Sequence, residues 1–372
     1  MKIRSVAVIL FTSVGLSILM SPPAVWSQLQ PLSLGTVTGV TPITCPSGYN
    51  SGTVCYTATV ENCSGALNLG FTYGELGTGS SGTIVTFNGG AGDTTPEGSP
   101  SFATDYSNAG YKVVQVVWSG PWEDTADGSG VSIKTAGCRP ATVLKYVYQN
   151  IYTNSSGTAG MCAQGTSAGS GAIGYALAEY GSGAYLDNVE LLSGPVFGDI
   201  EKGCVVPNTP TVTVCPAGVT ACNTGTEGGW PDPPQYIDGD ITAINNWSGI
   251  DACNGSSNTT SAENAAWKHM SIVDGLSDST LSYPNTAVAG WLCSNTSVSC
   301  GGAGNPCQNN SAAEGQYFYS AITADKQLEV YRVDECTGAE GVTGTSAHLP
   351  PPKASTSGYT AILDDMLNNC HH

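Results

Sequence analysis

Residues 160–181, GMCAQGTSAGSGAIGYALAEYG, decide how the fold of this chain is read. The first part, "GMCAQGTS", is a short apolar run typical of a buried strand, and "AGSGAIGYALAEYG" is typical of a helix rich in small residues. Between them, Gly165-Thr166-Ser167-Ala168-Gly169 fits the pattern G-x-S-x-G. A turn that leads directly from a strand into a helix is crowded, and small residues around Ser167 let it form. The stretch therefore predicts a strand, a tight turn and a helix, with Ser167 at the turn.

Strands and helices alternate on both sides of this stretch. Residues 28–65 read as short strands that open a sheet, and "SPSFATDYSNA" and residues 138–152 have helical patterns. Further runs typical of buried strands are "GTIVTFNGGAG" (82–92), "GYKVVQVVW" (110–118), "YLDNVELLSGPVF", "TAVAGWLC" (286–293) and "QLEVYRV", and "GYTAILDDMLNNC" is typical of a closing helix. This alternation predicts an α/β fold, a mostly parallel sheet with helices on both faces.

One region interrupts the alternation. Residues 199–283 carry four cysteines, "WPDPPQY" and an Asn/Ser/Thr-rich stretch, and predict a disulfide-pinned insertion or lid. Within it, "SAENAAWKHMSIV" predicts a helix that starts at Ser261. We expect an architecture of one domain, residues 28–372, with this insertion.

The N-terminus predicts export from the cytoplasm. Lys2 and Arg4 precede an apolar run over residues 6–20, and "SPPAVWSQ" follows, which is typical of a signal peptide over residues 1–27. The apolar run is too short to span a membrane comfortably, so we expect no membrane span. The chain has 14 cysteines, an even number, as expected for a secreted protein with disulfides. Cys45–Cys55 and pairs among Cys293, Cys300 and Cys307 are plausible local bridges.

The amino-acid composition argues against several classes of binding partner. Of the 372 residues, 29 are acidic and 11 are Lys or Arg, which gives a formal net charge of −18. This balance argues against binding nucleic acid or an anionic membrane surface, because both need basic patches. The cysteines form no C-x-x-C pair, and two of the four histidines, His371 and His372, stand at the C-terminus. We therefore expect no metal and no cofactor, and we expect this C-terminal pair to be mobile.

The turn and its context resemble the α/β-hydrolase superfamily over residues 83–370, setting the insertion aside. The elements occur in the order strand, Gly-Gly loop, helix, strand, helix and G-x-S-x-G turn. The loop Phe87-Asn88-Gly89-Gly90 resembles the H-G-G-G loop of lipases and esterases, with Asn in the His position. The resemblance implies that Ser167 is a nucleophile and that N–H groups near Gly90 and Ala168 form an oxyanion hole. It also implies an acid and then a histidine on loops after later strands.

The remaining members of the catalytic triad are less clearly marked. His348 follows the last predicted strand and precedes the last helix, whereas His269 lies in a predicted helix. The segment "DECTGAEGVTGTSA" separates His348 from its strand, so a solvated loop residue is the alternative interpretation. No carboxylate follows "TAVAGWLC". Asp199 after "VELLSGPVFG" is the first choice for the acid, Asp278 the alternative, and Asp334 and Glu340 are lesser candidates.

These residues predict a secreted serine hydrolase that cleaves carboxylic esters, polymeric ones included, through an acyl-enzyme. Trp118 and Trp122 could line its pocket or belong to the core. A serine peptidase on the same fold is the nearest alternative. The alternative outside the enzymes is a binding protein that has a hydrolase fold but has lost its catalytic triad.

Overall fold

The computed structural model describes residues 31–89, 100–123, 133–154, 157–192, 281–293, 327–333 and 356–372, with single residues and short pieces at 92, 96, 194, 196–198, 270–273, 318–319, 321–323, 337–338, 347–349 and 353. Most of the predicted insertion, residues 199–283, lies outside this part of the chain. So do the cysteines beyond Cys293 other than Cys370, and most of the helix predicted from "SAENAAWKHMSIV".

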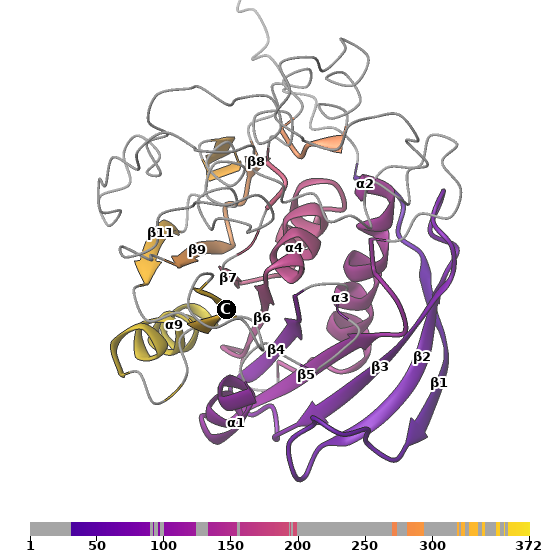
Figure 1. The fold of residues 1–372 in the computed structure, drawn as a ribbon, viewed down its shortest axis with the longest axis horizontal. Coiled ribbons are helices and arrows are strands. Elements are labelled where there is room, and N and C mark those ends of the chain that lie inside the picture. The colour runs from indigo at the N-terminus through magenta and orange to yellow at the C-terminus, as the bar shows by residue number, and fades with distance from the viewer. Residues whose placement is uncertain are drawn as a thin grey trace, which may run out of the picture. The chain divides into compact units, whose positions relative to one another are not determined.

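A nine-stranded sheet forms the centre of the described fold (Figure 1). Its strand order is β1-β2-β3-β5-β4-β6-β7-β9-β11. The strands are β1 (Thr36–Ile43), β2 (Val54–Glu61), β3 (Leu69–Leu76), β4 (Gly82–Phe87), β5 (Tyr111–Trp118), β6 (Gly160–Thr166), β7 (Asn188–Leu192), β9 (Ala287–Cys293) and β11 (Gln327–Val333). β1, β2 and β3 pair antiparallel with their neighbours. The remaining strands, β5, β4, β6, β7, β9 and β11 in sheet order, are parallel to one another. The predicted mostly parallel sheet is confirmed.

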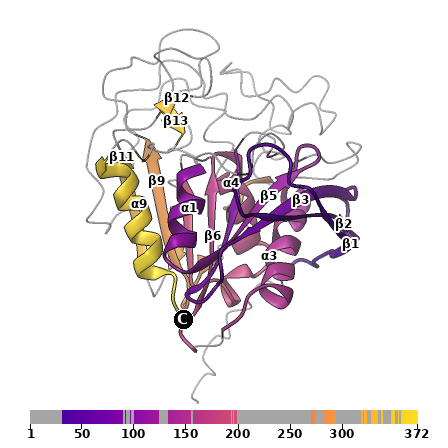
Figure 2. The ribbon, with the colours of Figure 1, turned by 90° about the horizontal axis from the view of Figure 1, so that it is seen from below.

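Helices cover both faces of the sheet, as predicted. α3 (Cys138–Asn150) and α4 (Ala168–Ala178) pack on one face, and α1 (Pro100–Asn108) and α9 (Thr356–Asn369) pack on the other (Figure 2). Parallel strands that are buried on both sides read as continuous apolar runs, and every residue of β4 and β6 is indeed buried. Shorter elements are α2 (Ile133–Ala136), η1 (Ser182–Ala184), β8 (Leu281–Ser282), β10 (Ile322–Thr323), β12 (Thr337–Gly338) and β13 (Ala347–Leu349).

The sequence prediction was wrong in detail at two elements. The strand expected from "YLDNVELLSGPVF" is shorter, because β7 ends at Leu192 and the chain then turns toward α4. In the helix expected up to Val273, Met270 is helical, but residues 271–273 are not. Their backbone instead donates to the segment after β7, from Ile272 N–H to Phe197 O (2.9 Å) and from Val273 N–H to Gly198 O (2.8 Å).

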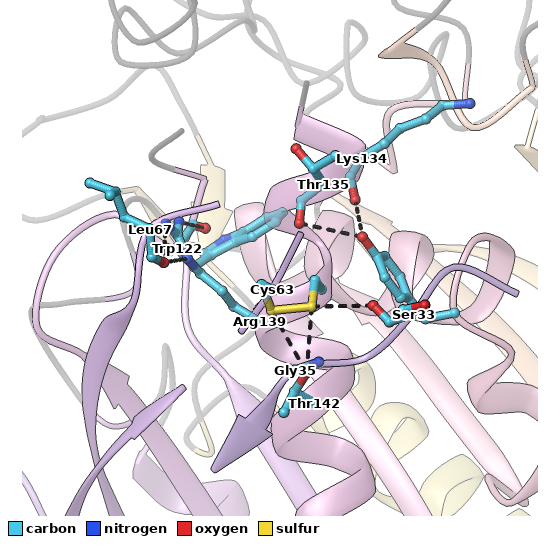
Figure 3. The surroundings of a disulfide bond; sticks show 11 residues. Ser33, Gly35, Cys63, Leu67, Trp122, Lys134, Thr135, Arg139 and Thr142 are labelled. Atoms are coloured by element: carbon cyan, nitrogen blue, oxygen red, sulfur yellow. Dashed lines mark hydrogen bonds between the residues drawn. A yellow bond between two sulfur atoms is a disulfide. The ribbon is translucent and has the colours of Figure 1, made fainter. Parts of the chain in front are cut away.

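Three disulfides connect the described residues. Cys45–Cys55 closes the β1–β2 hairpin, as predicted, and Cys63–Cys138 ties the end of β2 to the start of α3. Beside the second bridge, the buried guanidinium of Arg139 donates to Leu67 O (2.8 and 3.1 Å) and Trp122 O (2.7 Å), which holds the loop after β5 (Figure 3). Charge-assisted bonds of this kind satisfy a buried cation through backbone carbonyls.

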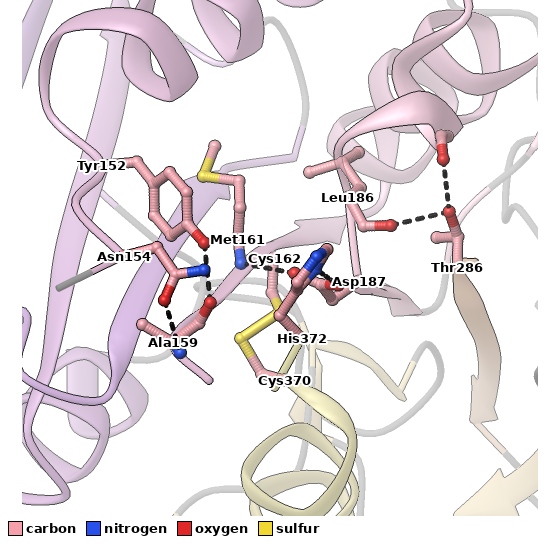
Figure 4. Close-up of polar contacts among 11 residues, drawn as sticks. Tyr152, Asn154, Ala159, Met161, Cys162, Leu186, Asp187, Thr286, Cys370 and His372 are labelled. Atoms are coloured by element: carbon pink, nitrogen blue, oxygen red, sulfur yellow. Dashed lines mark hydrogen bonds and ion pairs between the residues drawn. A yellow bond between two sulfur atoms is a disulfide. The ribbon is translucent and has the colours of Figure 1, made fainter. Parts of the chain in front are cut away.

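The third disulfide, Cys162–Cys370, joins β6 to the residue after α9 (Figure 4). The two histidines beyond it are held, so the expectation of a mobile pair was wrong. His371 forms a β-bridge with Ala159, and His372 Nδ1 lies 3.0 Å from Asp187 Oδ1. The other oxygen of Asp187 accepts the Met161 N–H at 2.9 Å. The disulfide places Cys370 beside β6, which brings the next two residues within reach of Ala159 and Asp187.

Among the described residues, no helix combines the length and the apolar character that crossing a lipid bilayer requires.

Candidate active site

Ser167 lies at the turn from β6 into α4, as the G-x-S-x-G pattern predicts. Its backbone has φ 54° and ψ −123°. A positive φ brings Cβ of an L-residue against its own backbone, and such conformations cost on the order of 1–3 kcal/mol in a residue other than glycine. The Ser167 N–H donates to Leu192 O at 2.8 Å, and Ser170 N–H donates to Ser167 O at 2.8 Å. The turn is thus held from β7 on one side and from its own helix on the other.

Four glycines make room for this turn. A Cβ at Gly165 would lie 2.2 Å from Gly169 O, and one at Gly169 would lie 2.4 Å from Phe87 O. A Cβ at Gly194 would lie 2.2 Å from Ser170 Cβ, and one at Gly89 would lie 2.6 Å from Ser167 Cβ. Real Cβ atoms do not approach other atoms so closely. The first two are the glycines of the sequence pattern, while Gly89 and Gly194 show that the loops after β4 and β7 press against the turn.

The loop after β4 therefore touches Ser167, as the predicted oxyanion loop should. Gly89 N–H donates to Asn88 Oδ1 at 2.7 Å, and Gly92 N–H donates to Gly89 O at 3.1 Å. Gly90, the residue predicted to supply an oxyanion N–H, lies outside the described residues. Ala168, the other predicted donor, is the first residue of α4, where a backbone N–H has no acceptor within the helix.

The sequence did not predict a role for Ser170, whose side chain stabilises the turn. Its buried hydroxyl donates to Gly165 O (2.8 Å) and lies 3.0 Å from Leu192 O. A single side chain thus bridges the end of β6, the end of β7 and the first turn of α4. The signal available in the sequence was weak, a serine among glycines and alanines in "AGSGA".

The predicted histidine lies in a strand, where a loop was expected. His348 is the central residue of β13, which pairs with β12 between β11 and α9. Figure 2 shows β12 and β13 at the end of the sheet away from the C-terminus. This is also the end at which Ser167 follows β6, because Gly160 at the start of β6 lies against Cys370.

The candidate acids lie outside the described residues, as do Asp334, Glu340 and His269. The chain leading to Asp199 is described up to Gly198. Phe197 in that segment is buried and, like Ser167, has a positive φ, of 51°. Asp278 belongs to residues 274–280, so the choice between the two acids stays a prediction.

The two tryptophans belong to the core. Trp118 and Trp122 are buried, and the ring of Trp118 stacks on Phe87 with centroids 6.4 Å apart. The alternative that they line a pocket is not supported, because both pack under the loop after β4, where Gly92 rests on Trp118.

No model of a protein family matches the chain, and no curated protein matches it by sequence. Among solved structures, it is similar to acetyl xylan esterase 1 from Thermoanaerobacterium sp. JW/SL YS485, at 11% identity over 90% of this chain and 88% of that chain, with a TM-score of 0.49. An acetyl xylan esterase from Paenibacillus sp. R4 gives 12% identity, 83% and 85% coverage and a TM-score of 0.47. A probable hydrolytic enzyme from Pseudomonas aeruginosa PAO1 gives 15% identity, 87% and 96% coverage and a TM-score of 0.42.

The fold itself is recognised from this chain's own topology. β4, the Asn88-Gly89 loop, α1, β5, α3 and β6 follow one another in the predicted order, and Ser167 then turns into α4 with a positive φ. The strand order places β6 in the middle of the parallel strands, between β4 and β7. The chain therefore has the fold of the α/β-hydrolase superfamily, with Ser167 at the turn between β6 and α4.

Proposed function

We propose that the protein is a secreted serine hydrolase that cleaves carboxylic esters, with Ser167 as the nucleophile. The conformation of Ser167 is the observation that carries this proposal. A strained backbone in a residue other than glycine persists only where the surroundings hold it, and such strain gathers at functional sites. Here four glycines and the two hydrogen bonds of Ser170 hold a serine, where a glycine would adopt the same φ without strain.

The proposed mechanism is acyl transfer. His348 takes the proton from Ser167 Oγ as that oxygen attacks the ester carbonyl, and the same proton passes from His348 to the departing alcohol. A water molecule then cleaves the acyl-enzyme with His348 again acting as base. Asp199, or alternatively Asp278, orients His348 and stabilises its charged form.

The oxyanion of each tetrahedral intermediate would be held by backbone N–H groups of Ala168 and Gly90. The proximity of Gly89 to Ser167 supports this assignment, because it brings the loop after β4 beside the nucleophile. Donors fixed in advance cost no reorganisation when the charge develops, which is why such a hole contributes on the order of 3–4 kcal/mol per donor. Ala168 also stands at the positive end of the α4 dipole.

Secretion is supported by the described disulfides, which persist in oxidising compartments, together with the signal-like N-terminus.

The test is labelling of the purified protein with a fluorophosphonate, followed by peptide mass spectrometry. We expect the label on Ser167, no label after heat denaturation, and none on the Ser167→Ala variant. Ser119→Ala is the matched control, since Ser119 Oγ is exposed and donates only to Gly70 O at 2.8 Å, and it should label as the parent does. Absence of both labelling and hydrolysis of short p-nitrophenyl esters by well-folded protein would reject the proposal and favour a ligand-binding role.

Variants at the other predicted positions then assign the roles. His348→Ala should reduce hydrolysis about as strongly as Ser167→Ala, because members of one triad act as a unit. Asp199→Asn and Asp278→Asn compared side by side identify the acid as the one whose loss lowers the rate by several orders of magnitude.

A further inference from the structure

A row of polar side chains crosses the sheet inside the protein, on the face covered by α1 and α9. Gln115 of β5, Thr86 of β4, Gln164 of β6 and Glu190 of β7 are neighbours in register and are all buried. The face is identified by Tyr106 of α1, whose hydroxyl lies 2.6 Å from Gln164 Nε2 and 3.5 Å from Glu190 Oε2. An ionisable group in such a place loses its hydration, so its charge state needs a structural explanation.

The two oxygens of Glu190 have different surroundings. Oε2 accepts a hydrogen bond from Gln164 Nε2 at 2.6 Å and faces the Tyr106 hydroxyl. Oε1 is buried and meets no donor among the described residues. Glu190 also forms no ion pair with a Lys, Arg or His of the described residues. Glu190 Oε2 therefore acts as a hydrogen-bond acceptor. Oε1 could form a hydrogen bond only if a proton were shared with a second acceptor.

A second carboxyl group, from the closing helix, supplies the other partner. Asp365 of α9 lies within hydrogen-bonding reach of Glu190, and its Oδ2 is buried, as is Glu190 Oε1. Its Oδ1 accepts the Asn369 amide at 3.0 Å. In each carboxyl group one oxygen therefore accepts from an amide, and the second oxygen is buried. A single proton between them satisfies both.

We propose that Glu190 and Asp365 form a buried proton-binding site, in which one shared proton ties α9 to β7. The proton makes one carboxyl group a donor and leaves the other an acceptor, so the pair carries one negative charge where it would otherwise carry two. Two adjacent carboxylates without water repel each other strongly, and removal of the proton replaces a hydrogen bond by that repulsion.

The groups around the pair favour the protonated state. Burial raises the pKa of Glu190 well above its ordinary value, the negative charge of Asp365 raises it further, and the bonds from Gln164 and Tyr106 oppose this only in part. Tyr106 and Asp365 are the titratable groups that face Glu190 from α1 and α9, while β6 presents Gln164 and β9 presents Ala289. Asp105, beside Tyr106, pairs instead with Lys353 and Tyr359.

The sign of the pH dependence follows from proton counting. The pKa of Glu190 is higher in the folded than in the unfolded chain, so the folded state binds more protons above the ordinary glutamate pKa of 4.5. The stabilisation is complete below that pH and is lost as the pH rises toward the raised pKa. Within this window the equilibrium constant for unfolding should rise about tenfold per pH unit through this one proton.

The experiment compares unfolding in urea from acidic to neutral pH for the parent, Glu190→Gln and Asp365→Asn. Each amide can donate to the remaining carboxylate without an added proton, so both variants should fold and lose the tenfold-per-unit dependence. Asp364→Asn is the matched control, since Asp364 neighbours Asp365 and is exposed, and the substitution is likewise from a carboxyl group to an amide. It should keep the parent's slope. Equal slopes for the parent and Glu190→Gln would overturn the proposal.

Infrared spectroscopy in D₂O tests the proton directly, even if a variant folds poorly. The folded parent at neutral pH should show the carbonyl band of a protonated carboxyl group, retained in Asp364→Asn and absent from Glu190→Gln and Asp365→Asn. Absence of this band from the parent at neutral pH would show that both carboxyl groups are ionised, against the proposal.

Discussion

The two ends of β6 are stabilised in opposite ways. At the amino end, Cys162 is joined covalently to Cys370, and Asp187 accepts the Met161 N–H. At the carboxyl end, Ser167 adopts a strained conformation in a space kept free by glycines. The amino end is stabilised by a disulfide and a hydrogen bond, whereas the carboxyl end requires glycines, which have no Cβ atom. The comparison shows how a single strand can be both a rigid anchor and the support of a strained residue.

The largest effect is expected from adding an atom at the carboxyl end. Gly165→Ala and Gly169→Ala place a methyl group 2.2 Å and 2.4 Å from backbone oxygens that cannot move without breaking the turn. We expect each to lower the free energy of unfolding by about 5 kcal/mol or more, measured by urea denaturation. Gly120→Ala is the control, since its Cβ would meet only Leu69 Cδ1 at 3.9 Å. Near-parent stability of Gly165→Ala would mean that the turn is not tightly packed.

Removing the covalent tie at the amino end should cost nearly as much. The chain-entropy account of disulfides predicts a loss of about 5 kcal/mol for a paired Cys162→Ala and Cys370→Ala variant, because the bridge spans 208 residues. The paired Cys45→Ala and Cys55→Ala variant opens a span of 10 residues and should lose about 3 kcal/mol. Denaturant titrations compare the two, and a larger loss for the short bridge would contradict the entropic argument.

Ser170→Ala tests whether the Ser170 hydroxyl, besides stabilising the fold, maintains the strained conformation of Ser167 at the carboxyl end of β6. It removes the hydroxyl that bridges Gly165 O and Leu192 O, for an expected loss of about 1–2 kcal/mol in unfolding free energy. If the turn depends on this bridge, the rate of fluorophosphonate labelling at Ser167 should fall as well. Ser119→Ala serves again as the exposed control, and an unchanged labelling rate in Ser170→Ala would separate the hydroxyl from the function of the turn.

The smallest effect is expected at the C-terminal histidine. The side chain of His372 is 66% exposed, so water screens its pairing with Asp187, and His372→Gln should change the unfolding free energy by about 0.5 kcal/mol or less. Asp187→Ala should cost about 1–3 kcal/mol, because it leaves the buried Met161 N–H without its acceptor. Thermal and urea denaturation of both variants would show whether the carboxylate or the ion pair matters.

The turn at Ser167 was predictable because its requirements are local. A strand, small residues and a helix lie within about twenty residues, and no distant contact is needed to recognise them. The C-terminal pair was mispredicted for the opposite reason. His371 and His372 look like a loose end in the sequence, and their contacts with Ala159 and Asp187 depend on residues that are more than 180 positions away.

The buried polar row could not be predicted from single strands. Gln164 and Glu190 each sit in an apolar run, and nothing in either run indicates that they pair in register beneath Tyr106. The strand order and the packing of α1 and α9 bring them together. The same holds for Ser170, whose two acceptors come from different strands.

The span of the Cys162–Cys370 bridge bears on how the chain is made. Cys45–Cys55 and Cys63–Cys138 join residues that leave the ribosome early, so both can close while synthesis continues. Cys162 cannot form its bridge until Cys370, 208 residues later, has been synthesised. Formation of this bond therefore requires the synthesis of α9, and a nascent chain arrested before that point would carry β6 with a reduced Cys162 thiol that could form a wrong disulfide.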